Sequence, residues 1–251
     1  MPFPKDINLL TAQSDSRALA TPRRYEARIA SIEEPAADTR ILKVDIAGRE
    51  TIPFRAGQYA MLSAGGFEPR AFSIASAPHL PWVEFHIKST GRGLSAHIFE
   101  TWKTGDAISL EAPFGDHHWR ASARPLLALA GGVGIAPLKA IIEAHFDHAA
   151  QSPAHLYWGV RDAAHLYLDG LFRELQKKHH GFHYVPLLAH AEAKTPLRTG
   201  FVGPAAGQDF PTLAGFNIYM AGPAAMVDAT LPLLLRHGAE KDFIFSDAFG
   251  P

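Results

Sequence analysis

The sequence contains no cysteine. Disulfide bonds and the usual cysteine-ligated iron–sulfur clusters are therefore excluded. The formal net charge of -1 provides no basic excess for binding nucleic acid or an anionic membrane. Apolar runs such as Leu126–Ala130 are far shorter than the roughly 20 residues that span a bilayer. Because Met1–Asp6 also lacks a signal-peptide pattern, we expect a cytoplasmic protein without a membrane span.

Metal-binding motifs are also lacking. There is no HExxH sequence, and the 14 histidines are scattered along the chain. Neighbouring pairs such as His117–His118 point their side chains apart, which is more typical of surface residues than of metal ligands. We therefore expect no metal site.

The first half of the chain has the pattern of a small antiparallel β-barrel. Residues 1–22 are polar and without period, and form an arm that is either disordered or docked across a domain junction. Residues 23–120 contain short segments rich in Val, Ile, Phe and Tyr, separated by turn signals. One helix interrupts them near Gly93. The six expected strands are Tyr25–Ile32, Arg40–Ile46, Tyr59–Ser63, Ala71–Ala75, Val83–Lys88 and Ala107–Glu111.

In residues 121–251, strands alternate with helices. This alternation predicts an α/β domain whose parallel sheet is covered on both faces. The expected strands are Leu126–Ala130, His155–Val160, Phe182–Leu188, Phe216–Ala221 and Phe243–Ser246, and the expected helices are Pro137–His148, Asp169–His179 and Ala224–His237. Pro232 should kink or split the last helix.

A glycine turn, Gly131–Gly134, joins a buried strand to a helix. Backbone N–H groups and a helix N-terminus meet at such a turn, which favours phosphate. The match to GxGxxG is imperfect, because Pro137 stands at the third glycine position, and a plain βα turn is the alternative. The next strand ends near Arg161, which suits the 2′-phosphate of NADPH, and Asp162, which suits the ribose of NADH.

Three further stretches could hold a ligand. In Arg70–Ser73, strand alternation puts Arg70 on one face, where it can bind a phosphate, and Ser73 on the other, where its hydroxyl can bond a ring nitrogen. The alternative is an ordinary barrel strand. The loop Lys88–Ser95 opens the barrel helix as a second anion site or merely as a capped helix start. The turn Ala221–Met226 lies at the same sheet edge as Gly131–Gly134, as a ligand site or only a connection.

In this order, these stretches resemble the ferredoxin–NADP reductase family. The likeness is greatest to the NAD(P)H:flavin reductases and to monooxygenase reductase components that lack the iron–sulfur domain. It also includes Phe54–Tyr59, Tyr157–Arg161 and Phe245–Phe249. It implies a flavin-binding barrel followed by a nicotinamide-nucleotide domain. FAD, or else FMN, is the implied cofactor, with NADH or NADPH as co-substrate.

The resemblance also implies roles for individual residues. Ser73 would be catalytic, beside flavin N5. Phe249 would shield the far flavin face, or else only fill the core. The implied flavin-binding residues are Arg70, Ala71, Phe72, Ser73, His86, Ile87, Lys88, Gly91, Gly93, Leu94, Ser95 and Phe249. The implied nicotinamide-nucleotide residues are Gly131, Gly132, Val133, Gly134, Pro137, Gly159, Arg161, Asp162, Gly222, Pro223 and Met226.

Two residues depart from the family pattern. Val133 stands where threonine is frequent, and Ala221 where cysteine is frequent. Both changes remove a polar group near the nicotinamide.

The expected activity is hydride transfer from NAD(P)H to a flavin, with electrons passed to a protein acceptor such as a ferredoxin or an oxygenase component. Tyr157–Arg161 favours NADH by a narrow margin. One alternative is a reductase that uses free flavin as its substrate. The other is a regulatory module that binds a nucleotide without turnover.

Overall fold

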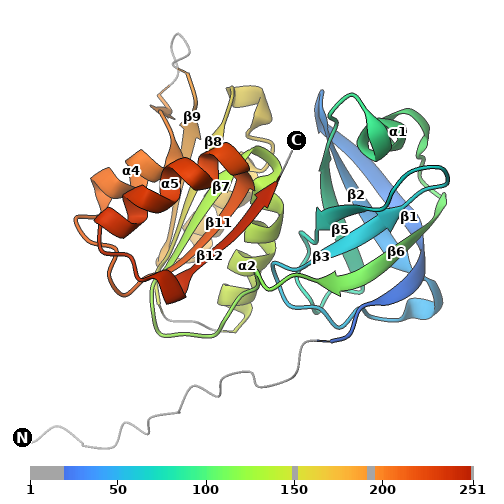
Figure 1. Cartoon of the computed structure of the whole chain (residues 1–251), viewed down its shortest axis with the longest axis horizontal. Coiled ribbons are helices and arrows are strands. Elements are labelled where there is room, and N and C mark those ends of the chain that lie inside the picture. The colour runs from blue at the N-terminus through green and yellow to red at the C-terminus, as the bar shows by residue number, and fades with distance from the viewer. Residues whose placement is uncertain (1–19, 149–151, 191–195, 250–251) are drawn as a thin grey trace, which may run out of the picture.

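The computed structural model describes residues 20–148, 152–190 and 196–249. They form two sheets that stand side by side, with helix α2 (Ile135–Asp147) between them (Figure 1). The predicted arm, residues 1–22, lies outside the described residues except for its last three. None of the described helices is long and apolar enough to be a candidate membrane span. The described residues also contain no cluster of three or more His, Asp or Glu side chains placed to hold a metal ion.

The N-terminal sheet has six antiparallel strands in the order β4-β3-β6-β1-β2-β5. Its strands are β1 (Arg23–Ala36), β2 (Thr39–Ile46), β3 (Tyr59–Ser63), β4 (Arg70–Ser73), β5 (Trp82–Lys88) and β6 (Ala107–Phe114). A 3-10 turn (Ala47–Arg49) follows β2, and helix α1 (Gly93–Thr101) follows β5. In β1, buried Tyr25, Ala27 and Ile29 alternate with exposed residues, as expected for a strand with one face on the core.

The two edge strands of this sheet meet at a single isolated bridge between Ile74 and Phe85. The number and direction of the strands confirm the predicted architecture, but the ring is only loosely closed between β4 and β5. The core inside it includes fully buried Leu42, Leu62 and Ile98.

The C-terminal sheet is parallel, in the order β10-β9-β8-β7-β11-β12. Its strands are β7 (Leu126–Gly131), β8 (Ala154–Val160), β9 (Phe182–Leu188), β10 (Arg198–Thr199), β11 (Asn217–Pro223) and β12 (Ile244–Phe249). The helices are α2, α3 (Asp169–Lys178), α4 (Val202–Asp209) and α5 (Ala224–Arg236), and 3-10 turns span Gly132–Gly134, Ala163–His165 and Lys241–Phe243. The chain adds β8 to β10 on one side of β7, and β11 and β12 on the other.

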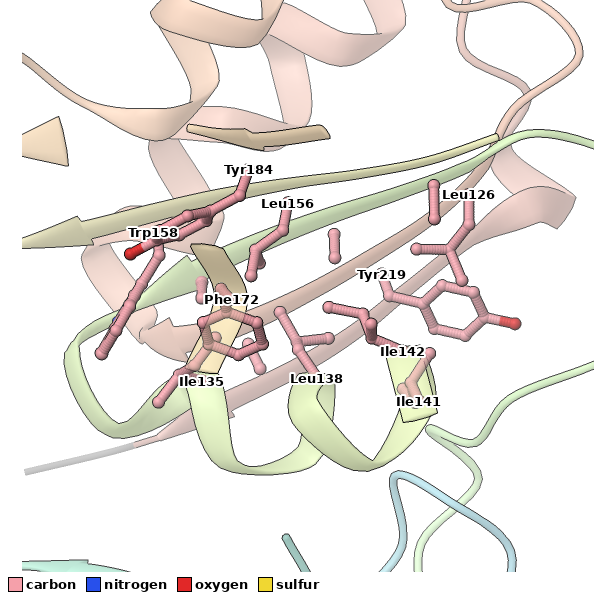
Figure 2. Packing of buried hydrophobic residues seen from close by; sticks show 14 of the residues in the cluster. Leu126, Ile135, Leu138, Ile141, Ile142, Leu156, Trp158, Phe172, Tyr184 and Tyr219 are labelled. Atoms are coloured by element: carbon pink, nitrogen blue, oxygen red, sulfur yellow. The ribbon is translucent and has the colours of Figure 1, made fainter. Parts of the chain in front are cut away.

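Apolar side chains cover both faces of this sheet, which explains why its strands read as apolar runs rather than alternating patterns. On one face, Ile135 and Leu138 of α2 and Phe172 of α3 pack with Leu156 and Trp158 of β8 (Figure 2). Helices α4 and α5 cover the other face (Figure 1). The order reverses beside β7, so a crevice is expected at the carboxyl ends of β7 and β11.

Four details correct the sequence analysis. His117 and His118 are buried, at 9% and 4% exposed, although the sequence favoured the surface for them. Pro232 does not split the last helix, because α5 runs without a break while Val227, Thr230 and Leu234 hold it on the sheet. Helix α4 was not expected. The last strand begins at Ile244, after a 3-10 turn that takes up Phe243.

Candidate active site

A cleft of about 490 Å³ opens between the two sheets, at the carboxyl ends of β7 and β11. Both sheets contribute to its walls. From β4, β5 and the loop after β5 come Ala71, Phe72, Ser73, His86, Lys88 and Thr90. From the ends of β7 and β11 and from the turn and helices that follow them come Gly131, Gly132, Val133, Ala136, Pro223, Ala224 and Ala225. The structure therefore brings together the Arg70–Ser73 strand and the two glycine turns that the sequence singled out.

Strand β4 presents consecutive residues to this cleft, although alternation predicted Phe72 and Ser73 on opposite faces. Strand β4 lies at the edge of its sheet, and Ala71, Phe72 and Ser73 all line the cleft. Ser73 is 8% exposed, and its Oγ donates a hydrogen bond to Asp247 Oδ2 at 3.3 Å. Burial raises the pKa of Asp247, and the bond from Ser73 acts against that rise.

A second cavity of about 540 Å³ shares Ala71, Phe72, Lys88 and Thr90 with the cleft. Its other lining residues are Gly66, Phe67, Glu68, Arg70, Arg92, Gly93, Leu94 and Ser95. Arg70, Lys88 and Arg92 make it basic, and Gly93 and Leu94 begin helix α1. Because the two cavities share these four lining residues, they adjoin, and an elongated ligand with an anionic middle can lie across both.

The turns after β7 and β11 are packed together at their glycines. A Cβ on Gly134 would stand 2.1 Å from the carbonyl oxygen of Ala221, and one on Gly131 would stand 2.6 Å from Met226 Sδ. Gly132 differs, because it has φ +54 and open space around the position of a Cβ. Its carbonyl accepts a hydrogen bond from Trp158 Nε1 at 2.9 Å, which ties the turn to β8. Gly134 and Gly131 thus hold the two turns together, while Gly132 faces the cleft.

Arg161 and Asp162, which were predicted to bind the nicotinamide nucleotide, lie just beyond β8 and outside both cavities. Arg161 Nε donates to Asp162 Oδ2 at 3.1 Å. His165 Nδ1 lies 2.5 Å from Asp162 Oδ1, and its Nε2 lies 3.3 Å from Oδ1 of Asp38, in the turn between β1 and β2. The hydrogen bonds from His165 and then Arg161 lower the pKa of Asp162. A carboxylate and a guanidinium thus lie side by side beyond the end of β8, and their role in binding the coenzyme stays a prediction.

Several other predicted residues line neither cavity. Ile87 is fully buried in the first core, and the Cβ of a residue in place of Gly159 would stand 3.1 Å from Val202 Cγ1. The other predicted residues outside both linings are Gly91, Gly134, Pro137, Gly222 and Met226. The backbone of Phe249 pairs with Pro223 at the end of β12, and a role for its side chain stays a prediction.

Asp247, Phe67, Arg92 and Thr90 contribute to the site but are not among the site residues predicted from the sequence. A signal existed for Arg92 and Thr90, since both lie in the Lys88–Ser95 loop already proposed as an anion site. Asp247 is 174 residues from Ser73, so no local pattern connects the two.

The two cavities fit a flavin dinucleotide and a nicotinamide nucleotide. Basic side chains surround the shared section, Phe72 offers an aromatic wall, and Ser73 offers a hydroxyl donor. The open space at Gly132 leaves room for a ligand to approach the backbone of the turn.

Comparisons with known proteins agree with this arrangement. An oxidoreductase FAD-binding domain matches residues 26–119, and an oxidoreductase NAD-binding domain matches residues 128–231. The CDP-6-deoxy-L-threo-D-glycero-4-hexulose-3-dehydrase reductase of Yersinia pseudotuberculosis is 34% identical over 91% of this chain and 70% of its own. The NAD(P)H-flavin reductase of Vibrio harveyi is 32% identical over 89% of this chain and 98% of its own.

A solved structure shows the same two-domain fold. The cytochrome P450 reductase of Amycolatopsis superposes with a TM-score of 0.88 and 30% identity, covering 94% of this chain and 72% of that one. The strand pairing, the two matched domains and two relatives matched over 70% and 98% of their own length all indicate one family. The chain belongs to the ferredoxin–NADP reductase family, as an oxidoreductase with an FAD-binding domain followed by an NAD-binding domain.

Proposed function

We propose that this protein uses a bound FAD to take a hydride from NADH or NADPH and to pass electrons to a protein acceptor, a ferredoxin or an oxygenase component. The observation that carries the proposal is the shared cleft. Phe72 and Ser73 on one wall face the turn Gly131–Val133 on the other. A donor nucleotide and an acceptor ring held on opposite walls of one cleft would meet without a further domain movement.

Residues of the N-terminal sheet would hold the flavin. Arg70, Lys88 and Arg92 would bind its phosphates, and Phe72 would lie along its ring. Two-electron acceptance from a nicotinamide and release of single electrons are the chemistry that a bound flavin supplies. The second cavity would receive the adenosine half, which favours FAD over FMN because FMN would leave that cavity unfilled.

Ser73 is the proposed catalytic residue. Its hydroxyl carries one proton, which Asp247 accepts in the structure. A flavin ring nitrogen would compete for the same proton, because the Asp247 bond at 3.3 Å is long. The reaction needs no strong acid or base, since the protein has only to orient two rings and to exclude water.

Residues of the C-terminal sheet would hold the nicotinamide nucleotide. The turn Gly131–Gly134 presents backbone N–H groups at the start of α2, and Pro223 begins the facing turn. Arg161 and Asp162 would contact the adenosine ribose or its 2′-phosphate. We also propose a cytoplasmic location, where reduced nicotinamide nucleotides are supplied.

The alternative is reduction of free flavin. It is favoured by the Vibrio harveyi relative, which is named as an NAD(P)H-flavin reductase and of which the chain covers 98%. The two functions differ in whether flavin stays on the protein. The basic second cavity favours retention, because it adds phosphate and adenosine contacts to those of the ring.

The test begins with the visible spectrum of the purified protein after gel filtration. A retained flavin supports the proposal, and a colourless protein that reduces added flavin supports the alternative. Under anaerobic conditions NADH or NADPH should then bleach the bound flavin, and a plant-type ferredoxin should restore its colour. A protein that bleaches neither bound nor added flavin is the regulatory module, and the proposal is wrong.

A further inference from the structure

A lysine is buried at the junction of the two sheets. Lys139 lies on α2, one turn after the glycine turn that begins this helix, and only 8% of the residue is exposed. Burial of a lysine is costly unless its charge is paired and its N–H groups are bonded. The contacts of Lys139 therefore show what the burial achieves.

The Lys139 ammonium group has three partners, which equals its number of donors. It donates to the Ala75 carbonyl oxygen at 3.1 Å, and it pairs with Glu84 at 3.3 Å and with Glu143 at 2.9 Å. Glu143 lies on the same helix, but Glu84 lies on β5 and Ala75 follows β4, both in the N-terminal domain. Lys139 thus joins α2 to the segment that follows β4 and to β5 at once.

The same network continues into the cleft through His86. Glu84 Oε1 lies 2.9 Å from His86 Nε2, and Tyr167 Oη lies 3.0 Å from His86 Nδ1. Burial opposes ionisation of Glu84, but the His86 hydrogen bond and the Lys139 charge lower the pKa of Glu84 to about 2. The ionised carboxylate only accepts, so His86 carries its proton on Nε2 and accepts the Tyr167 hydroxyl on Nδ1. The ring of His86 is therefore fixed by Glu84 of the N-terminal domain and Tyr167 of the C-terminal domain.

The positions of these contacts relate the network to the reacting groups. Ala75 lies two residues after Ser73, and Glu84 lies two residues before His86, which lines the cleft. Gly132 and Val133 lie at the start of the helix that carries Lys139. One ammonium group therefore touches the supports of both cleft walls.

We propose that Lys139 is a positioning residue for hydride transfer, which fixes the turn that receives the nicotinamide against the strands that receive the flavin. The inference rests on the proposed function. Lys139 does not touch the cleft, so its effect passes through the distance between the walls. A displacement of about 1 Å at a reacting pair can slow transfer about 100-fold.

The substitution Lys139→Met removes the charge and retains most of the side-chain volume. We expect the limiting rate of flavin bleaching at saturating NADH to fall about 100-fold, while the flavin affinity and the half-saturating NADH concentration change less than twofold. Lys139→Arg should retain most of the rate. The control is Asp147→Asn, because Asp147 on the same helix makes an exposed pair with His79 across the same junction, at 3.2 Å. It should leave the rate unchanged.

A distance measurement tests the same idea without turnover. The chain has no cysteine, so Ala30→Cys on β1 and Lys178→Cys on α3 give two unique sites for spin labels on exposed positions. Double electron–electron resonance should show one narrow distance distribution in the labelled parent and in Asp147→Asn. Lys139→Met should broaden or shift it. Should Lys139→Met not fold, Glu84→Gln removes the ion pair and should change rate and distribution in the same direction.

An unchanged distribution together with an unchanged rate overturns the proposal. So does a broadened distribution with an unchanged rate, or a slowed rate with an unchanged distribution, because the two must change together. If the parent itself does not bleach its flavin, the proposed function fails and the role in hydride transfer with it. The distance measurement then still decides whether Lys139 fixes the two sheets.

Discussion

Gly134 offers a sharp test of how the two turns of the cleft depend on each other. Its backbone is ordinary, with φ -60, so alanine meets no conformational obstacle there. The obstacle is space. A Cβ would lie 2.1 Å from the Ala221 carbonyl oxygen, 2.4 Å from its carbon and 2.7 Å from Gly222 N. Ordinary contact begins at 3.4 Å, so the turns must separate by about 1.3 Å.

The expected cost follows from the atoms involved. All three neighbours are backbone, which cannot rotate away as a side chain can. Overpacking of this kind costs about 3 kcal/mol, at the upper end of its usual range. Gly132→Ala is the matched control, because it meets nothing within 4 Å but has φ +54. Its strain should cost only about 1 kcal/mol.

Urea unfolding of both variants measures these costs. Trp158 is the single tryptophan of the C-terminal domain, and its bond to Gly132 makes its fluorescence a probe of the Gly131–Gly134 turn. All proteins compared carry Phe in place of Trp82, Trp102 and Trp119, so that only Trp158 is observed. We expect Gly134→Ala to lower the midpoint clearly more than Gly132→Ala at an equal slope. Equal midpoints for the two variants would refute the close packing of the turns after β7 and β11.

Three further predictions concern the chemistry and the charges. Ser73→Ala should slow the bleaching of bound flavin by NADH about tenfold, the value of one hydrogen bond of roughly 1.4 kcal/mol; an equal rate in stopped-flow traces would remove Ser73 from the reaction. Asp162→Ala should free Arg161 and raise the ratio of kcat/KM for NADPH over NADH about tenfold, and an unchanged ratio would place the coenzyme elsewhere. Burial lowers the pKa of His117 from 6.5 to about 4, so the unfolded chain binds more protons between these values and stability falls as the pH is lowered through them. His117→Leu should reduce the loss of stability between pH 7 and pH 4 by about 3 kcal/mol, and urea unfolding at these two pH values that shows the same loss in both proteins would contradict it.

Much of the fold could be predicted, because most strands and helices have a recognisable pattern of apolar residues along the sequence. The central strand β7 is an unbroken apolar run, and β1 alternates. Helix α4 was not predicted, because Val202–Asp209 contains two glycines and a proline, which disfavour a helix. Tertiary packing overrides that preference, since Val202, Ala205 and Ala206 are buried against the sheet.

In the candidate site, too, local features could be predicted and contacts between distant residues could not. Glycine turns and the Arg70–Ser73 strand carry their own signals, and the cleft brings them together. Contacts between distant residues carry none. Lys139 reads as an ordinary helix residue, and Glu84 lies 55 positions away on a strand, so their pairing depends on how the two sheets meet. The family resemblance suggests what these residues do, whereas the folded structure gives their positions.

The buried charges at the junction also bear on recombination between reductases. Apart from residues 115–125, which join β6 to β7, the two sheets are held by contacts that a grafted domain must reproduce. A foreign nicotinamide domain with an apolar residue at the position of Lys139 would leave Glu84 buried without its lysine partner, a penalty of several kcal/mol. Acceptable graft partners are thus those with a cation at this one helix position, and a chimera library from this protein can be filtered on it before any gene is made.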